Sequence, residues 1–215
     1  RFGVVVEPAP KLKLSGGVSM LYGAGFHEGS AATKDVLVWR DANENSIVEL
    51  TEIQVIPATV ATPSETFDRF AVGGDLELSL QMPVLGRLAL RGELVRSQNL
   101  ARGETPADPI AAGRDFREWG GYLALTQEFT KYVSAGVRYD RFDPDADATD
   151  RLPLALVPGD RTLASWSFNV TGGYAPYGLL TVQLDLNHNP YGLDPSGRPA
   201  TLADNRFTLR AEAGF

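Results

Sequence analysis

Polar and apolar residues alternate along most of this chain, and that alternation is the feature that most constrains its fold. In residues 72–82, Leu76 and Leu80 fall on one side of an extended chain, while Asp75 and Glu77 fall on the other. Successive side chains of a β-strand point to opposite faces, so a period of two predicts strands with one apolar and one polar face. The longer period of an amphipathic helix is scarce. The chain is therefore predicted to be all-β.

About nine segments share this alternation. They are residues 2–6, 12–22, 72–82, 87–94, 118–129, 133–140, 165–174, 180–187 and 204–215. Short turns are expected near residues 8–10, 83–86, 130–131 and 176–178. Long polar connections are expected at residues 27–66, 100–114, 144–160 and 191–203. Turns that are short at one end and long at the other are typical of an up-and-down, antiparallel, transmembrane β-barrel.

Composition excludes several classes of protein and leaves the membrane open. A net charge of −7 argues against a nucleic-acid partner, and the absence of cysteine excludes disulfides and thiolate metal sites. No run approaches the roughly 18 apolar residues of a membrane-spanning helix, but a barrel strand needs only about 9–11 residues with every second one apolar. A soluble barrel would turn the apolar face into its lumen, whereas a membrane barrel turns it to lipid.

Three features indicate that the apolar face contacts lipid, as in a membrane barrel. The long connections all fall at one end, and aromatic residues cluster near strand ends on the apolar face. These aromatic residues are Trp119, Phe129, Trp166, Tyr174, Phe207 and Phe215. Such residues form the girdles at the two membrane interfaces. The last strand, which ends on Phe215, resembles the terminal signal that the barrel-assembly machinery reads in outer-membrane proteins. The predicted location is the lipid bilayer of a bacterial outer membrane, with the signal peptide removed.

Strand parity adds an expectation about the ends of the chain. The segment 204–215 follows a long loop, so it ends on the periplasmic side, where the short turns lie. Counting back through nine strands places Arg1 at the outer side, whereas single-chain barrels normally have an even number of strands. We therefore expect residues 1–215 to be a single unit that forms the C-terminal part of a barrel of 16 or 18 strands, with residues missing before Arg1.

Several stretches resemble a known family as a set. They are residues 14–34 (LSGGVSMLYGAGFHEGSAATK), 62–86 (TPSETFDRFAVGGDLELSLQMPVLG) and 107–151 (ADPIAAGRDF to DPDADATDR), together with the last strand. They resemble the C-terminal half of phosphate-selective porins (porins O and P) and their porin-like relatives. The resemblance implies a water-filled passive channel and a homo-oligomer, often a trimer. It does not carry phosphate selectivity to this chain, because the dense basic residues that give that selectivity are lacking.

The polar faces of the predicted strands supply candidate pore-lining residues of both signs. The basic ones are Lys11, Lys13, Arg87, Arg91, Arg138, Arg206 and Arg210. The acidic ones are Glu7, Asp75, Glu77, Glu93, Glu118, Glu128, Asp140, Asp185 and Glu212. Charge at a constriction sets the ion selectivity of a channel. The alternative is that most of these charges pair across neighbouring strands and only keep the lumen wet.

The predicted extracellular loop 27–66 contains a candidate calcium site in residues 41–52 (DANENSIVELTE). Its candidate ligands are Asp41, Asn43, Asn45, the Ile47 carbonyl, Glu49 and Glu52. They occupy the first, third, fifth, seventh, ninth and twelfth positions of an EF-hand loop. Ser46 stands where the sharp turn prefers glycine, and the flanks 35–40 and 47–50 read as strands rather than helices. The alternative is an ordinary polar hairpin tip. A second acidic stretch, 143–150, reads as a solvated loop.

Catalysis is not expected. The only histidines are His27 and His188, neither has a serine two residues away, and no Gly-x-Ser-x-Gly motif occurs. The predicted function is a passive outer-membrane porin for small hydrophilic solutes or ions. The alternative is a structural or interaction barrel with a filled lumen, whose long external loops bind a partner.

Overall fold

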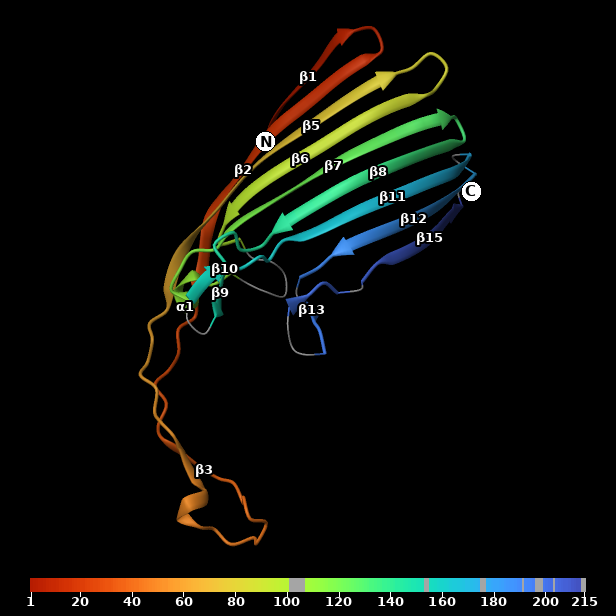
Figure 1. Cartoon of the computed structure of the whole chain (residues 1–215). Coiled ribbons are helices and arrows are strands. Elements are labelled where there is room, and N and C mark those ends of the chain that lie inside the picture. Colours follow the sequence, from red (N-terminus) through yellow and green to blue (C-terminus); the bar gives the residue numbers. More distant parts are fainter. Residues whose placement is uncertain are drawn as a thin grey trace.

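The computed structural model describes residues 1–100, 107–152, 155–174, 177–190, 192–195, 199–202 and 204–213. Nine long strands form one antiparallel sheet in which each strand pairs with its neighbours along the chain (Figure 1). They are β1 (Phe2–Ala9), β2 (Leu12–His27), β5 (Glu65–Gln81), β6 (Arg87–Gln98), β7 (Arg117–Thr130), β8 (Val133–Asp143), β11 (Leu163–Tyr174), β12 (Gly178–His188) and β15 (Arg206–Ala213). The predicted all-β class and the predicted nine strands are confirmed.

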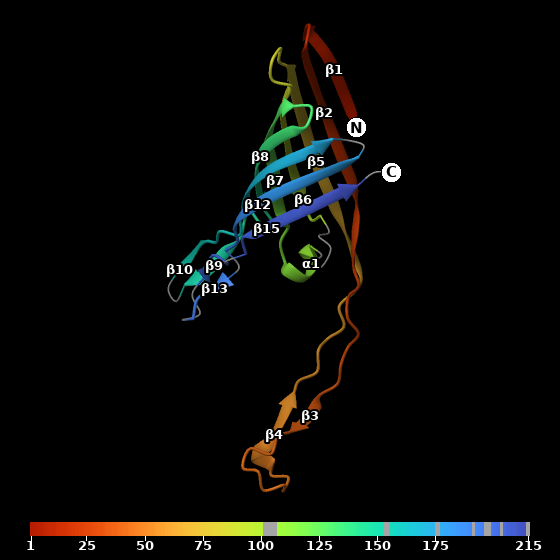
Figure 2. The same cartoon turned by 90° about the vertical axis from the view of Figure 1, so that its right-hand side faces the viewer.

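The sheet is open. Strand β1 pairs with β2, and β15 pairs with β12, but no pairing joins β1 to β15 among the described residues. The sheet curls, so that these two edge strands come round to the same side of the molecule (Figure 2). Because neighbours alternate in direction, the first and ninth strands run parallel. The antiparallel arrangement is therefore confirmed, while closure into a barrel stays a prediction.

The connections separate by length, as predicted. All the short turns lie at one end of the sheet, and the long connections lie at the other end (Figure 1). Lys11 occupies the turn between β1 and β2 with a φ of 74°. The assignment of Lys11 to the polar side of a strand is therefore wrong, because Pro10 and Lys11 form the turn, and a type II turn has a positive φ at its second central residue.

The long connections carry small elements, of which β3 was predicted as the strand at 35–40. They are β3 (Val36–Trp39), the 3₁₀ turn Leu50–Glu52, β4 (Ile53–Ile56), helix α1 (Pro109–Ala112), β9 (Thr149–Leu152), β10 (Ala155–Pro158), β13 (Gly192–Leu193) and β14 (Pro199–Ala200). The strand expected at 47–50 is wrong: β4 begins at Ile53, because β3 pairs Val36 with Ile56 and Trp39 with Ile53. Strand β5 begins seven residues before the predicted start at residue 72, since it continues beside the equally long β2.

Large apolar side chains do not form a buried core. Among the described residues, the buried apolar side chains are alanines and prolines, whereas Leu94 is 62% exposed and Val170 is 53% exposed. These two belong to one face of the sheet, here called the apolar face, which also carries Leu76, Leu123 and Leu184. The opposite face, here called the polar face, carries most of the charged residues of the same strands. A chain of this length usually folds in water by burying large apolar side chains, and the described residues show no such burial.

Within the described residues, no helix is both long enough and apolar enough to cross a membrane.

Candidate functional site

The polar face of the sheet brings together the charged residues that the sequence predicted to share one side. Arg87 and Arg91 both reach Glu77, with closest nitrogen–oxygen distances of 2.6 Å and 3.2 Å. Arg206 reaches Asp185 at 3.0 Å, and Asp185 is almost fully buried. Further ion pairs of this face join Arg1 to Asp75, Arg138 to Asp140 and Arg210 to Glu212. The alternative interpretation, that these charges pair across neighbouring strands, therefore holds for Arg87, Arg91 and Arg206. Arg138 and Arg210 instead pair with a carboxylate of their own strand.

Other predicted pore-lining residues make hydrogen bonds or line small hollows on the same face. Glu118 is only 2% exposed and accepts a hydrogen bond of 2.7 Å from the Ser97 hydroxyl. Glu128 accepts the backbone amide of Arg87 at 3.1 Å. Lys13 lies with Glu77 in a small hollow near the turn end of the sheet. That all these residues line an aqueous pore stays a prediction.

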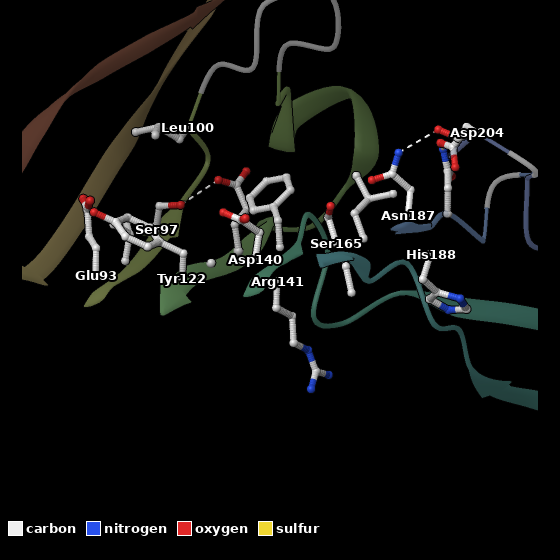
Figure 3. Close-up of a pocket in the computed structure, with 18 residues that line it drawn as sticks. Glu93, Ser97, Leu100, Tyr122, Asp140, Arg141, Ser165, Asn187, His188 and Asp204 are labelled. Atoms are coloured by element: carbon white, nitrogen blue, oxygen red, sulfur yellow. Dashed lines mark hydrogen bonds between the residues drawn. The ribbon is translucent and has the colours of Figure 1, made fainter. Parts of the chain in front are cut away.

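A cavity of about 560 Å³ opens on the polar face at the loop end of the sheet (Figure 3). Glu93 of β6 and Asn187 of β12 both line it, although three strands separate β6 from β12. Side chains from such distant strands converge only on the inside of a curved sheet, so the polar face is the concave one. Figure 3 shows Ser97 and Asp140 at this cavity, while the side chain of Arg141 points away from it.

The connection between β6 and β7 is fixed to the sheet by one buried asparagine. Asn99 is 1% exposed, and its amide nitrogen donates to the Asp115 carboxylate at 2.7 Å and to the Asp68 carbonyl at 3.2 Å. Its amide oxygen accepts the backbone N–H of Phe116 at 2.9 Å. A buried amide with its donors and acceptor satisfied holds both ends of this connection together.

Helix α1 is held near the end of β2 by a histidine–carboxylate contact. Asp108 caps the helix by accepting the Ala111 amide at 3.0 Å, and its other oxygen lies 2.7 Å from Nδ1 of His27. The Ala111 amide first, and the His27 contact second, lower the pKa of Asp108 below its ordinary value. Gly113 ends the helix with a φ of 66°. The sequence between Asp108 and Gly113 thus has an N-cap, a proline at the first position and a C-terminal glycine.

Two further loops meet at the same end of the sheet through arginine–carboxylate pairs. Arg114 donates to the Asp145 carboxylate with both terminal nitrogens. Arg117 donates to the Asp147 carboxylate with Nε and one terminal nitrogen. The hydrogen bond to Asp145 raises the pKa of Arg114, and the hydrogen bond from Arg117 lowers the pKa of Asp147. The acidic stretch 143–150 therefore anchors neighbouring loops, which is more than the solvated loop that the sequence indicated.

The candidate calcium segment lies at the tip of a long arm, residues 28–64, that projects from the loop end (Figure 1). The Asp41 carboxylate accepts the amides of Asn45 and Ser46, at 3.1 Å and 2.7 Å. Glu52 accepts the Ala42 amide and the Trp39 indole N–H, both at 3.0 Å.

The other candidate ligands belong to the same hydrogen-bonded turn. Asn43 accepts the Asn45 amide, the Asn45 side chain donates to Glu49 at 3.0 Å, and its oxygen accepts the Ile47 amide. Ser46 has a φ of 61°, the left-handed conformation for which an EF-hand uses glycine. No group of three or more histidine, aspartate or glutamate side chains placed to hold a metal ion occurs among the described residues. Calcium binding stays a prediction.

Aromatic side chains mark both ends of the apolar face. At the turn end, the rings of Tyr132 and Tyr174 lie 5.4 Å apart, and Lys131 lies over both. At the loop end, the rings of Tyr139 and Trp166 lie 4.7 Å apart. Phe207, another of the predicted girdle residues, is exposed on β15, whereas Phe215 lies outside the described residues.

Searches of family models, of curated proteins and of solved structures give no match to this chain. The resemblance to phosphate-selective porins therefore stays a prediction, and the geometry of the two faces has to indicate the function.

Sequence reasoning missed the contacts that join distant loops. No local signal identifies the partners of Asn99 or His27, because they are brought together only by the sheet. The helix at Asp108 could have been found, since its cap, proline and glycine stand in the expected order.

Proposed function

We propose that this chain is part of an outer-membrane β-barrel that acts as a passive channel for small hydrophilic solutes or ions. The observation that carries the proposal is the exposure of large apolar side chains along the apolar face, while most of the strand charges lie on the concave, polar face. An apolar surface of this extent is unstable in water and is the outer surface of a membrane barrel.

The spacing of the aromatic residues supports a membrane. Trp166 and Tyr174 both lie on the apolar face of β11 and are eight residues apart. At about 3.4 Å per residue they are roughly 27 Å apart along the strand, or about 20 Å along the membrane normal for a tilt near 40°. That height approaches the apolar band of about 25 Å that lies between the aromatic girdles of membrane barrels.

Closure of the proposed barrel requires more than these nine strands. The edge strands β1 and β15 run parallel, so pairing them directly would break the antiparallel pattern. An odd number of further strands restores the pattern, and both a 16- and an 18-stranded barrel satisfy that condition. We propose a barrel of this size because its interior would hold water rather than be filled by side chains. A trimeric assembly, and recognition of the last strand by the barrel-assembly machinery, remain part of the proposal.

Two measurements test this function. Brominated lipids in the vesicles should quench the fluorescence of Trp166 strongly and that of Trp39, in the projecting arm, very little, when each is the single tryptophan of the protein. Vesicles that contain the protein should swell in solutions of small sugars and resist larger ones. Equal quenching of Trp166 and Trp39, or impermeable vesicles despite correct insertion, would contradict the proposal.

A second function, an interaction barrel, is favoured by one observation. The ribbon of β3 and β4 in the arm exposes apolar side chains on both of its faces, among them Leu37, Val55 and Ile56. An isolated two-stranded ribbon is only marginally stable in water, so a bound partner would stabilise it. Deletion of residues 28–64 should leave permeability unchanged if the protein is a channel. Loss of all activity together with the arm would favour the interaction function.

A further inference from the structure

Two arginines interrupt the apolar face at its loop end. Arg96 of β6 stands directly opposite Trp119 of β7, so their side chains share that face. Arg141 of β8 stands opposite Gly121, and its guanidinium carbon lies 4.7 Å from the centre of the Trp119 ring. Figure 3 shows Arg141 pointing away from the cavity on the polar face. The three residues form one outward-facing group, here called the Arg–Trp–Arg group.

The two arginines of this group lack the partners that arginines on the polar face have. Arg87, Arg138 and Arg206 each form an ion pair with a carboxylate. Within the described part of the chain, Arg96 and Arg141 make neither an ion pair nor a side-chain hydrogen bond, although both are exposed. An unpaired guanidinium on an apolar face retains all its hydrogen-bond donors for a ligand.

Carboxylates near the group are engaged with other donors. Asp143 accepts the amide of Asp145 at 3.1 Å, and Asp147 is held by Arg117. Asp160 accepts the amide of Thr162 at 2.9 Å, and this contact is the first cause of its lowered pKa. Asp147 attracts Arg96 and Asp160 attracts Arg141 through space, but neither acid accepts a hydrogen bond from these guanidinium groups.

The position of the group matches the depth at which lipid phosphates lie. Trp119 of β7 and the ring pair of Tyr139 and Trp166 form the aromatic band at the loop end of the apolar face. Trp119 stands opposite Asp143 and Tyr139 opposite Leu123, so Trp119 lies nearer the rim. In a membrane barrel such a band lies at the interface, where the hydrocarbon ends and the headgroups begin. Near this interface a lipid-facing arginine costs only about 0–1 kcal/mol. Arg141 extends from the Gly121 level towards the band, as an interfacial cation does.

We propose that Arg96, Trp119 and Arg141 bind the phosphate group of an anionic lipid in the leaflet at the loop end of the barrel. The two guanidinium groups donate hydrogen bonds to phosphate oxygens, for which their planar fork is well suited. The Trp119 ring packs against the lipid below its headgroup. The inference rests on the proposed function, because it requires the apolar face to contact lipid.

Lipid retention by the purified barrel tests this site. The test variant is Arg96→Gln with Arg141→Gln, and the control variant is Arg91→Gln with Arg210→Gln, which removes the same charge from the polar face. Each protein is transferred from detergent into mixed micelles with phosphatidylglycerol or phosphatidylcholine, and bound lipid is counted by native mass spectrometry. Removing two charge-assisted contacts should weaken phosphatidylglycerol binding at least tenfold in the test variant and leave the control at the wild-type value.

The outcomes separate the site from the proposed function. Equal phosphatidylglycerol binding by the wild type and the test variant would overturn the site. Displacement of the lipid by inorganic phosphate at matched concentration would also overturn it, because the ligand would then be a soluble anion. Arg96→Lys with Arg141→Lys keeps both positive charges but removes the planar guanidinium groups, so it should bind phosphatidylglycerol with intermediate affinity. This variant still tests the site if the glutamine variant does not fold. Failure of the wild type to insert into vesicles would instead contradict the proposed function.

Discussion

A charge placed in the middle of the apolar face should be costly, and the same charge one residue away should not. Val170 on β11 lies four residues from Trp166 and four from Tyr174, so it stands midway between the two aromatic bands. Arginine on the lipid face at the middle of a bilayer costs about 2–4 kcal/mol. The Val170→Arg variant should therefore lower the folding equilibrium constant by roughly 30- to 700-fold. Asn169→Arg points to the polar face and should change the free energy of unfolding by less than about 0.5 kcal/mol.

The measurement is urea unfolding of each variant in phosphatidylcholine vesicles, followed by tryptophan fluorescence and by the heat-dependent mobility of the folded barrel. The two substitutions add the same side chain to adjacent residues, so they differ only in the face they modify. If water rather than lipid contacts Val170, arginine there would be an ordinary surface residue, and both variants would unfold within about 0.5 kcal/mol of the wild type. That result would refute the assignment of the apolar face to lipid.

Three further predictions concern the loop end. Because the pKa of Asp108 is lowered in the folded protein, its carboxylate stabilises helix α1 fully above the usual carboxyl range, and this stabilisation is lost as the pH falls through the lowered pKa. Asp108→Asn should therefore speed tryptic cleavage after Arg114 at neutral pH. Unchanged cleavage would contradict this prediction. Calcium should protect the arm 28–64 from proteolysis in the wild type but not in Glu52→Gln, whereas no protection of the wild type would make the calcium prediction wrong. Glu93→Gln should reduce the preference of the channel for cations in reversal-potential measurements, because the neighbouring arginines are already paired with other carboxylates. An unchanged reversal potential would mean that residues other than Glu93 set the selectivity.

The alternation of the sequence was enough to predict the sheet. Strands such as β11 and β12 follow the period of two throughout, and each pairs with the next strand along the chain, so local pattern and topology agree. The nine long strands and the division of turns by length could therefore be predicted. The starts of strands were less accurate: β5 begins at Glu65 because its partner β2 extends to His27, which is a tertiary cause that no local pattern records.

The contacts within the loops could not be predicted for the same reason. Asn99 reads as an ordinary polar residue at the end of a strand, and only the folded chain brings it to Asp68 and Asp115. The charges on strands were more predictable, because residues such as Glu77 and Arg91 stand opposite each other once the register is set by the apolar residues. Which of these charged residues form ion pairs could be seen only in the folded structure.

The central claim is that a water-filled barrel surrounds the polar face. Its most direct test is the conductance of the protein, purified in folded form from its own membrane, in a planar lipid bilayer under a salt gradient. The proposed channel predicts stable steps of current that are conserved after removal of the arm 28–64, with a reversal potential that favours cations. A silent bilayer, with insertion of folded protein verified independently, would contradict a channel and favour a barrel whose lumen is filled.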